Sequence, residues 1–182
     1  PFELFDEYGT DAVRFGTMLM SPQGLDVLFS SNRLEVGRNF MNKLWNASRF
    51  VLMNLKDGQT LDINFEKEKL DLPEQWILSK LQKSVQAYNR QLERFHFNEA
   101  AKVLYDFTWN DFCDWYIEIT KIHFREKDSQ KGDVVRGAIV HVLKTILALL
   151  HPYAPFITEE LWSQFKSEKD LELIVSPWPD YH

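Results

Sequence analysis

Apolar residues recur along most of this chain at the three- and four-residue spacing that is typical of amphipathic α-helices. Four such stretches are long enough to form the helices of a bundle. They are expected to begin at Ser30 or Ser31, near Pro73, after a cap at Asn98 and after a cap at Asp133. Helices of this length joined by short connections pack most simply side by side, each burying one apolar stripe against its neighbours. The pattern therefore predicts an all-α fold, an antiparallel up-and-down helical bundle.

The third stretch has an acidic residue on its apolar side. Three- and four-residue steps give a seam of Ala101, Leu104, Thr108, Asp111, Trp115, Ile119 and Ile122, broadened by Phe107, Phe112 and Tyr116. A carboxylate inside a bundle needs hydrogen-bonding partners, because an unpaired buried charge is costly. We expect Asp111 to be buried and held in such a network.

The two ends of the chain depart from the bundle pattern. Residues 1–30 predict two short helices separated at Gly9, followed by a turn near residues 21–24 and an extended stretch at 27–29. These helices need not join the bundle core. We therefore expect a connector over residues 1–30 and a helical bundle over residues 31–182.

Two segments of the bundle region are not predicted to form long helices. Residues 56–72 are charged and contain Asp57-Gly58, which predicts a connecting excursion. Pro155 starts a fifth, shorter helix. Residues 171–179 contain two prolines and are expected to lie extended over the bundle.

The helix predicted over residues 31 to about 54 has two faces of opposite character. At about 100° per residue, its apolar arc holds Leu34, Gly37, Met41, Leu44, Ser48, Val51, Leu52 and Leu55, with Phe40 and Trp45 at the borders. The opposite side holds Arg38, Asn39, Asn42, Lys43, Asn46 and Arg49, together with Phe50 and Met53. Guanidinium groups, carboxamides and an exposed ring can pair with phosphates, read base edges and stack on unpaired bases. Many surface helices have a similar polar face, so the pattern alone favours a face that contacts only solvent.

The distribution of charge favours a ligand for this face. The whole chain has a formal net charge of −6, which argues against a general affinity for nucleic acid. Residues 31–56 contain five basic residues and one acidic residue, a local net charge of +4. A basic helix on an acidic body would attract a polyanion to one place and repel it elsewhere.

Composition bounds the remaining possibilities. A chain of 182 residues with 45% hydrophobic residues can bury a sizeable core. The longest apolar run, residues 145–150, is too short to span a bilayer, and the first residues show no signal-peptide pattern. The single cysteine, Cys113, excludes an internal disulfide, so we expect a cytoplasmic protein. The start at Pro1, within a helical pattern, suggests a piece of a longer polypeptide.

No motif for catalysis or metal binding stands out. A di-metal bundle needs a Glu-x-x-His pair from each of two helices, and only Glu93 with His96 fits. Cys113 has acidic and aromatic neighbours where a nucleophile needs a base, so we interpret it as a packing residue. Phosphate-binding glycine loops are absent from the sequence as well. We therefore expect no catalytic residue, no metal and no cofactor in this chain.

Four blocks of the sequence resemble the valyl-tRNA synthetase family. The run Arg38–Val51, RNFMNKLWNASRFV, is similar to the family's signature helix. Three further blocks agree with it: Tyr8–Phe15 (YGTDAVRF), Phe97–Ala101 (FNEAA) with Phe112–Glu118 (FCDWYIE), and His151–Trp162 (HPYAPFITEELW). The block Tyr8–Phe15 is similar to the segment that follows the K-M-S-K-S loop of class I synthetases. The resemblance covers nearly the whole chain.

This resemblance implies the anticodon-binding bundle of an enzyme that uses ATP with Mg²⁺ to join valine to its tRNA. The H-I-G-H and K-M-S-K-S motifs of the catalytic domain are absent, so this piece alone is expected to be non-catalytic. The implied partners are the anticodon stem-loop of tRNA(Val) and the catalytic domain of the same polypeptide, with no membrane. Residues 1–30 would then pack near that domain.

The resemblance also supplies a ligand for the two-faced helix. The expected anticodon-binding residues are Arg38, Asn39, Asn42, Lys43, Asn46, Arg49 and Phe50. Phe50 could stack on a base or could instead pack under residues 56–72. Two other functions stay open at this point: the same domain of an isoleucyl or leucyl enzyme, and a protein-interaction bundle whose basic face docks an acidic partner.

Overall fold

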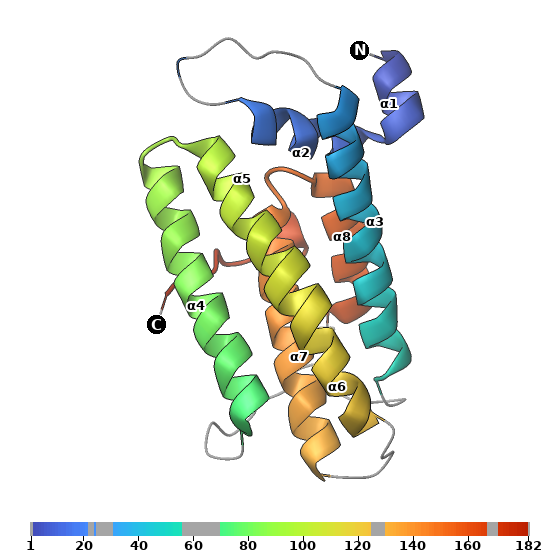
Figure 1. Cartoon of the computed structure of the whole chain (residues 1–182), viewed down its shortest axis with the longest axis vertical. Helices are drawn as coiled ribbons and strands as arrows, with labels where there is room; N and C mark the ends of the chain where they lie inside the picture. The colour runs from blue at the N-terminus through green and yellow to red at the C-terminus, as the bar shows by residue number, and fades with distance from the viewer. Residues whose placement is uncertain are drawn as a thin grey trace.

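Helices make up all the regular secondary structure in the described part of the chain (Figure 1). The structure is a computed structural model, and it describes residues 2–21, 24, 31–55, 70–124, 130–166 and 171–181. The helices are α1 (Phe2–Tyr8), α2 (Thr10–Met20), α3 (Ser31–Met53), α4 (Leu72–Glu93), α5 (Phe97–Asp106), the π-helix η2 (Phe107–Tyr116), α6 (Ile117–Phe124), α7 (Gln130–Leu150), α8 (Pro155–Phe165) and the 3₁₀-helix η3 (Leu173–Val175).

Successive long helices alternate in direction, so the predicted up-and-down bundle is confirmed (Figure 1). In that view α3 runs down, α4 up, α5 through α6 down, α7 up and α8 down. Two predicted helix starts were wrong. Asn98 lies inside α5, which has His96 before its first residue, and α7 begins three residues before Asp133. Asp133 instead pairs with the Arg136 guanidinium at 3.0 Å. The extended stretch at 27–29 and residues 56–69 lie outside the described residues.

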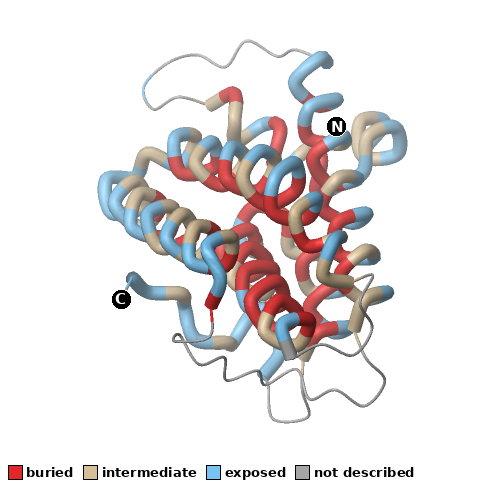
Figure 2. Tube along the Cα trace, turned by 60° about the horizontal axis from the view of Figure 1, so that its bottom comes forward, coloured by how far each residue is buried: buried red, intermediate tan, exposed pale blue. Residues whose placement is uncertain are grey.

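The central element of the bundle is α7. It contacts α3, α4, α5, α6 and α8, and nearly all its residues from Val135 to Leu150 are buried. The broad red band along this helix in Figure 2 reflects burial on several sides rather than on one stripe. A helix that is apolar all round is buried inside a protein, and α7 accordingly packs against α8 as well as against α4 and α5.

The second helix packs tightly onto the bundle, contrary to the expectation that the N-terminal helices need not join the core. The Phe15 ring of α2 is fully buried and stacks on Phe40 of α3 with ring centroids 4.7 Å apart. Gly37 permits this contact, because a Cβ atom there would lie 2.3 Å from the carbonyl oxygen of Ala12. Arg14 adds a polar link, since its guanidinium donates to the carbonyl of Tyr153 at 3.2 Å and to that of Pro152 at 3.0 Å.

The long helix from Phe97 to Phe124 changes its hydrogen-bond register in the middle. In a π-helix the bonds join residues five apart, so side chains that face the core recur at a wider spacing than in an α-helix. The buried pairs in and just after η2 are separated by five residues and then by four, both wider than the 3.6-residue turn of an α-helix: Phe107 with Thr108, then Phe112 with Cys113, then Tyr116 with Ile117.

This register change makes the second half of the predicted seam wrong. Trp115 is 64% exposed and Ile122 is 66% exposed, although both were expected to face the core. Asp111 is not buried in a hydrogen-bond network either. It is only half-buried, and its carboxylate pairs with the Lys80 ammonium of α4 at 3.2 Å.

The C-terminal tail lies against the bundle, as predicted, but it is not extended throughout, because Leu173–Val175 form the 3₁₀-helix η3. The indole of Trp178 stacks on the buried ring of Tyr88 in α4 at 6.0 Å, and its Nε1 donates to Oδ1 of Asn89 at 3.0 Å. Leu173 in η3 is buried as well. Within the described ranges, no helix has the length and apolar character needed to cross a bilayer.

Candidate nucleic-acid interface

One side of α3 presents a stripe of polar side chains to solvent. Asn39, Asn42, Asn46 and Arg49 are all exposed and follow one another at three- and four-residue spacing. They therefore lie on one side of the helix and extend for about 15 Å along its axis. We call these four residues the polar stripe.

The buried side of α3 fixes the direction in which the polar stripe points. Leu34, Phe40, Leu44 and Val51 are fully buried in the bundle core. Ser48, also fully buried, satisfies its hydroxyl group by donating to the carbonyl of Leu44 at 2.9 Å. Because these anchors recur over more than four turns, α3 cannot rotate without exposing them, and the stripe stays accessible.

Lys43 lies beside the stripe but has partners of its own. Its ammonium forms an ion pair with the Asp114 carboxylate of η2 and sits 4.0 Å from the centre of the Trp109 ring. The positive charge of Lys43 is therefore balanced within the fold. Among the described residues, no carboxylate lies within ion-pair distance of Arg49. Within that part of the chain, Arg49 can therefore offer a ligand an unpaired positive charge, whereas Lys43 cannot.

Phe50 packs against α6 rather than pointing freely into solvent. Its half-buried ring lies 5.9 Å from the ring of Phe124, and the Lys121 ammonium lies 5.8 Å from its centre. The alternative was that Phe50 packs under residues 56–72, and residues 56–69 of that segment lie outside the described residues. Only part of the ring is accessible for stacking on a base.

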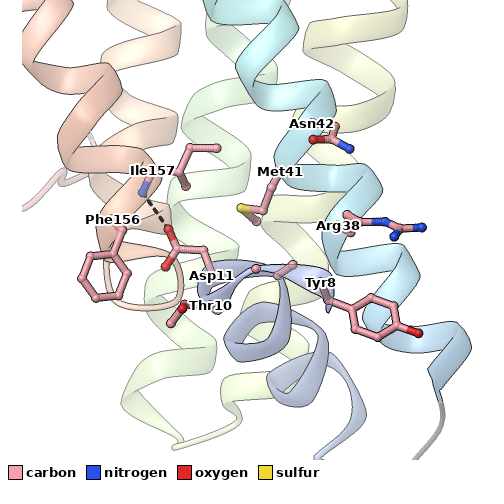
Figure 3. Close-up of a pocket in the computed structure, with 10 residues that line it drawn as sticks. Tyr8, Thr10, Asp11, Arg38, Met41, Asn42, Phe156 and Ile157 are labelled. Carbon is pink, nitrogen blue, oxygen red and sulfur yellow. Dashed lines mark hydrogen bonds between the residues drawn. The ribbon is translucent and has the colours of Figure 1, made fainter. Parts of the chain in front are cut away.

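Arg38 lies on the other side of the polar stripe, at the edge of a pocket (Figure 3). Its guanidinium carbon is 5.4 Å from the centre of the Tyr8 ring, which holds the group over α1. The pocket has a volume of about 340 Å³ and is formed by the turn between α1 and α2, by α3 and by the start of α8. Arg38 and Asn42 belong both to the predicted site and to this pocket.

A buried carboxylate joins α2 to α8 beneath this pocket. Oδ2 of Asp11 accepts a hydrogen bond from the backbone N–H of Ile157 at 2.6 Å, as the dashed line in Figure 3 shows. Burial raises the pKa of Asp11, and the backbone N–H groups of Ile157 and Phe156 lower it. Asp11 thus caps the start of α8 from a different helix, but burial has the larger effect, so its pKa lies above the ordinary value, and its Oδ1 has no hydrogen-bond partner among the described residues.

Sequence reasoning missed the pocket and the partners of Lys43. Tyr8, Phe156 and Arg38 come from segments far apart in the chain, so no local spacing could have grouped them. Asp114 and Trp109 reach Lys43 only because η2 departs from the α-helical register. The prediction for Cys113 agrees with the structure: the thiol is buried, and burial raises its pKa to about 12.

Comparison with known proteins identifies the family of this domain. The family model described as the anticodon-binding domain of tRNA ligase matches residues 74–182, which is more than half of the chain. The chain belongs to this family. The matched region runs from the start of α4 to the C-terminal tail and does not include α3.

Curated relatives extend the similarity to α3 and to the N-terminal helices. The chain is 45% identical over 184 residues to the valine–tRNA ligase of Dehalococcoides mccartyi strain CBDB1, covering 98% of this chain and 20% of that protein. It is 45% identical over 176 residues to the valine–tRNA ligase of Syntrophotalea carbinolica, with 97% and 20% covered. The chain thus spans about a fifth of the length of these relatives.

Solved structures show the same fold in synthetases for other amino acids. The LeuRS of Agrobacterium radiobacter K84, in a ternary complex with tRNA and LeuAMS, matches with a TM-score of 0.73 and 22% identity over 100% of this chain and 20% of that chain. The apo methionyl-tRNA synthetase of Mycobacterium tuberculosis matches with a TM-score of 0.70 and 17% identity over 87% and 33%. At these identities the likeness establishes the fold alone.

Proposed function

We propose that this domain recognises the anticodon region of tRNA(Val) within a valine–tRNA ligase, and that the polar stripe of α3 faces the RNA. The observation that carries the choice of amino acid is the similarity of nearly the whole chain to valine–tRNA ligases, at 39–46% identity. Joining valine to tRNA would use ATP and Mg²⁺ in a catalytic domain outside this chain. Residues 1–30 would link the bundle to that domain, and the enzyme would work in the cytoplasm.

The chemistry of the polar stripe suits the unpaired bases of an anticodon loop. Each asparagine carboxamide offers both a donor and an acceptor, so Asn39, Asn42 and Asn46 can pair with base edges. Arg49 can bind a phosphate through two parallel hydrogen bonds. Bases turned out of a loop expose these edges, whereas paired bases in an A-form helix do not.

Arg38, Lys43 and Phe50 are proposed to contribute less uniformly. Arg38 retains a guanidinium at the edge of the stripe, while the charge of Lys43 is already balanced by Asp114. Phe50 offers only the accessible part of a half-buried ring. We therefore expect the asparagines and Arg49 to make the main contacts.

Binding of a tRNA(Val) transcript to the parent ligase at several salt concentrations tests this proposal. Arg49→Ala should weaken binding by about tenfold or more, because a charge-assisted hydrogen bond is lost. It should also reduce the slope of log K against log salt by about 0.7 to 0.9, the loss of one phosphate contact. Lys43→Ala should change both quantities less, since its charge is paired in the free protein.

The matched control is Arg90→Ala. Arg90 is exposed on α4, on the opposite side of the bundle from α3 in Figure 1, and its loss should leave binding unchanged. Equal effects of Arg49→Ala and Arg90→Ala would remove the stripe from the RNA interface. Salt-dependent binding of an acidic protein would favour the interaction-bundle alternative if tRNA binding showed no preference for the valine anticodon.

A further inference from the structure

An ion pair joins α3 to η2, part of the long helix that runs beside α3 from α5 to α6 (Figure 1). The Lys43 ammonium pairs with the Asp114 carboxylate and lies 4.0 Å from the centre of the Trp109 ring. The lysine side chain is 26% accessible and the aspartate side chain is 47% accessible. Solutes can therefore reach this pair, although its two charges balance each other.

A second lysine beside α3 has the same kinds of partner. The Lys121 ammonium of α6 lies 5.8 Å from the centre of the Phe50 ring of α3 and pairs with the Glu118 carboxylate at 2.6 Å. Asp114 and Glu118 are four residues apart and both exposed, so they are neighbours on one side of their helix. We call these two carboxylates the acidic edge. Each carboxylate of the acidic edge balances the charge of one lysine.

The acidic edge decides which cations the RNA-facing side of α3 can offer. Lys43 belongs to that side by helical spacing, but Asp114 balances its charge. Arg49 has no such partner in the part of the chain that the structure describes. An RNA backbone that approaches Lys43 or Lys121 therefore meets a carboxylate beside the ammonium, whereas one that approaches Arg49 meets a free guanidinium.

This difference between cations affects two modes of RNA binding unequally. Sequence-independent binding comes almost entirely from phosphate contacts, so an RNA can shift until it meets as many free cations as possible. Sequence-specific binding adds contacts to base edges, here from the asparagines of the polar stripe, and these hold the RNA in one register. Balancing the charge of a lysine outside that register therefore weakens the first mode more than the second.

We propose that Asp114 and Glu118 are specificity-determining residues, because they keep Lys43 and Lys121 from binding the phosphates of poorly matched RNAs. The inference rests on the proposed function, since it requires RNA on the polar stripe. It adds a repulsive element, supplied by η2 and α6, to the attractive contacts of α3. The two carboxylates act through the lysines and need not contact the correct tRNA themselves.

Equilibrium binding to the parent ligase tests the inference with two transcripts, tRNA(Val) and the same RNA with a non-valine anticodon. Asp114→Asn keeps the shape of the side chain and frees the Lys43 ammonium. The changed-anticodon transcript should then bind about three- to tenfold more tightly, the range for one added hydrogen bond. Its slope of log K against log salt should steepen by about 0.7 to 0.9. The affinity for tRNA(Val) should rise less, so the ratio of the two affinities falls.

Two further variants show whether the effect depends on the lysines. With Lys43→Met as the starting protein, Asp114→Asn should change affinity and salt slope much less, because no ammonium remains to be freed. Glu118→Gln should act in the same direction as Asp114→Asn, through Lys121. Thermal unfolding of each variant checks that the domain remains folded, and a purely structural role of the pairs would leave the ratio of affinities unchanged.

The matched control is Glu172→Gln. Glu172 pairs with Lys166, and their side-chain accessibilities of 59% and 29% are similar to those of Asp114 and Lys43. Glu172 belongs to the tail, which packs on α8 and α4. Its substitution should leave the binding of both transcripts unchanged.

The inference and the proposed function fail in different ways. Equal gains for both transcripts, or a gain that persists in Lys43→Met, would overturn the inference. Weaker binding of tRNA(Val) by Asp114→Asn would contradict it as well, because the carboxylate would then contact the RNA directly. If neither transcript responds while Arg49→Ala still weakens binding, only the inference is lost. If Arg49→Ala has no effect either, the proposed function is lost with it.

Discussion

The two long helices that meet at Lys43 and Asp114 follow different rules. In α3 the buried positions keep the three- and four-residue spacing of a regular α-helix from Leu34 to Val51. In the helix from Phe97 to Phe124, the π-helical segment η2 shifts which side chains face the core. The comparison shows that apolar spacing predicts a helix face only while the hydrogen-bond register stays constant.

This difference also has a functional side. The regular helix keeps its polar stripe exposed over its whole length, whereas the irregular one turns Asp114 and Trp109 toward α3. These two residues engage Lys43, one of the cations that the pattern assigned to the RNA-facing side. Asp114 of the irregular helix therefore neutralises one cation of α3, which lowers the positive charge that α3 can offer a ligand.

The largest expected effect tests the register of η2 directly. Phe112→Ala should lower the free energy of unfolding by about 3 to 5 kcal/mol, because the fully buried ring leaves a cavity. Trp115→Ala should cost less than about 1 kcal/mol, because that side chain is mostly exposed. Urea unfolding measures both values. If Trp115→Ala lowered the free energy of unfolding more than Phe112→Ala does, the regular α-helical register would continue through this segment.

A smaller effect concerns Glu74 of α4, which lies against η2. Its carboxylate is buried and accepts a hydrogen bond from the Tyr116 hydroxyl at 3.3 Å, and burial raises the pKa of Glu74. The folded state therefore binds the Glu74 proton more tightly than the unfolded state does. The resulting stability is fully present below the ordinary glutamate pKa and is lost as the pH rises through the higher folded-state value.

Replacing this carboxyl group should stabilise the protein at neutral pH. Glu74→Gln keeps an oxygen acceptor for Tyr116 and removes the buried charge, so we expect the Tm at pH 7 to rise by about 2 to 4 °C. The gain should shrink as the pH approaches 4.5, where the native carboxyl is also protonated. Thermal unfolding followed by circular dichroism measures this, with the exposed Glu99→Gln in α5 as the control. A constant gain at all pH values would contradict the assignment.

The smallest effect is expected at Asp111, which apolar spacing placed inside the bundle. Its pair with Lys80 is partly exposed, with 22% of the aspartate and 44% of the lysine side chain accessible. Asp111→Asn should therefore lower the free energy of unfolding by only about 0.2 to 1 kcal/mol. The comparison variant is Asp106→Asn, an exposed acid on α5. If Asp111→Asn lowered the free energy of unfolding by several kcal/mol, the result would instead support the buried hydrogen-bond network that the sequence predicted.

Much of the fold could be predicted because each helix carries its own periodic signal. The start of α4 near Pro73 and the start of α8 at Pro155 were located correctly, since proline favours the first turn of a helix. The apolar arc predicted from Leu34 to Leu55 is buried as far as Val51, whereas Leu52 and Leu55 are only half-buried. The caps at Asn98 and Asp133 were wrong, because the helices begin earlier than these favourable residues.

The sequence by itself determined the helical class, the two faces of α3 and, through similarity to relatives, the family. These depend on residue types and spacings along one segment, where an amphipathic pattern can be satisfied in only one orientation. Only the tertiary structure decided that α2 packs on Gly37, that Asp114 pairs with Lys43 and that Tyr8, Arg38 and Phe156 meet at one pocket. Those features depend on contacts between segments distant in the chain, which local periodicity does not encode.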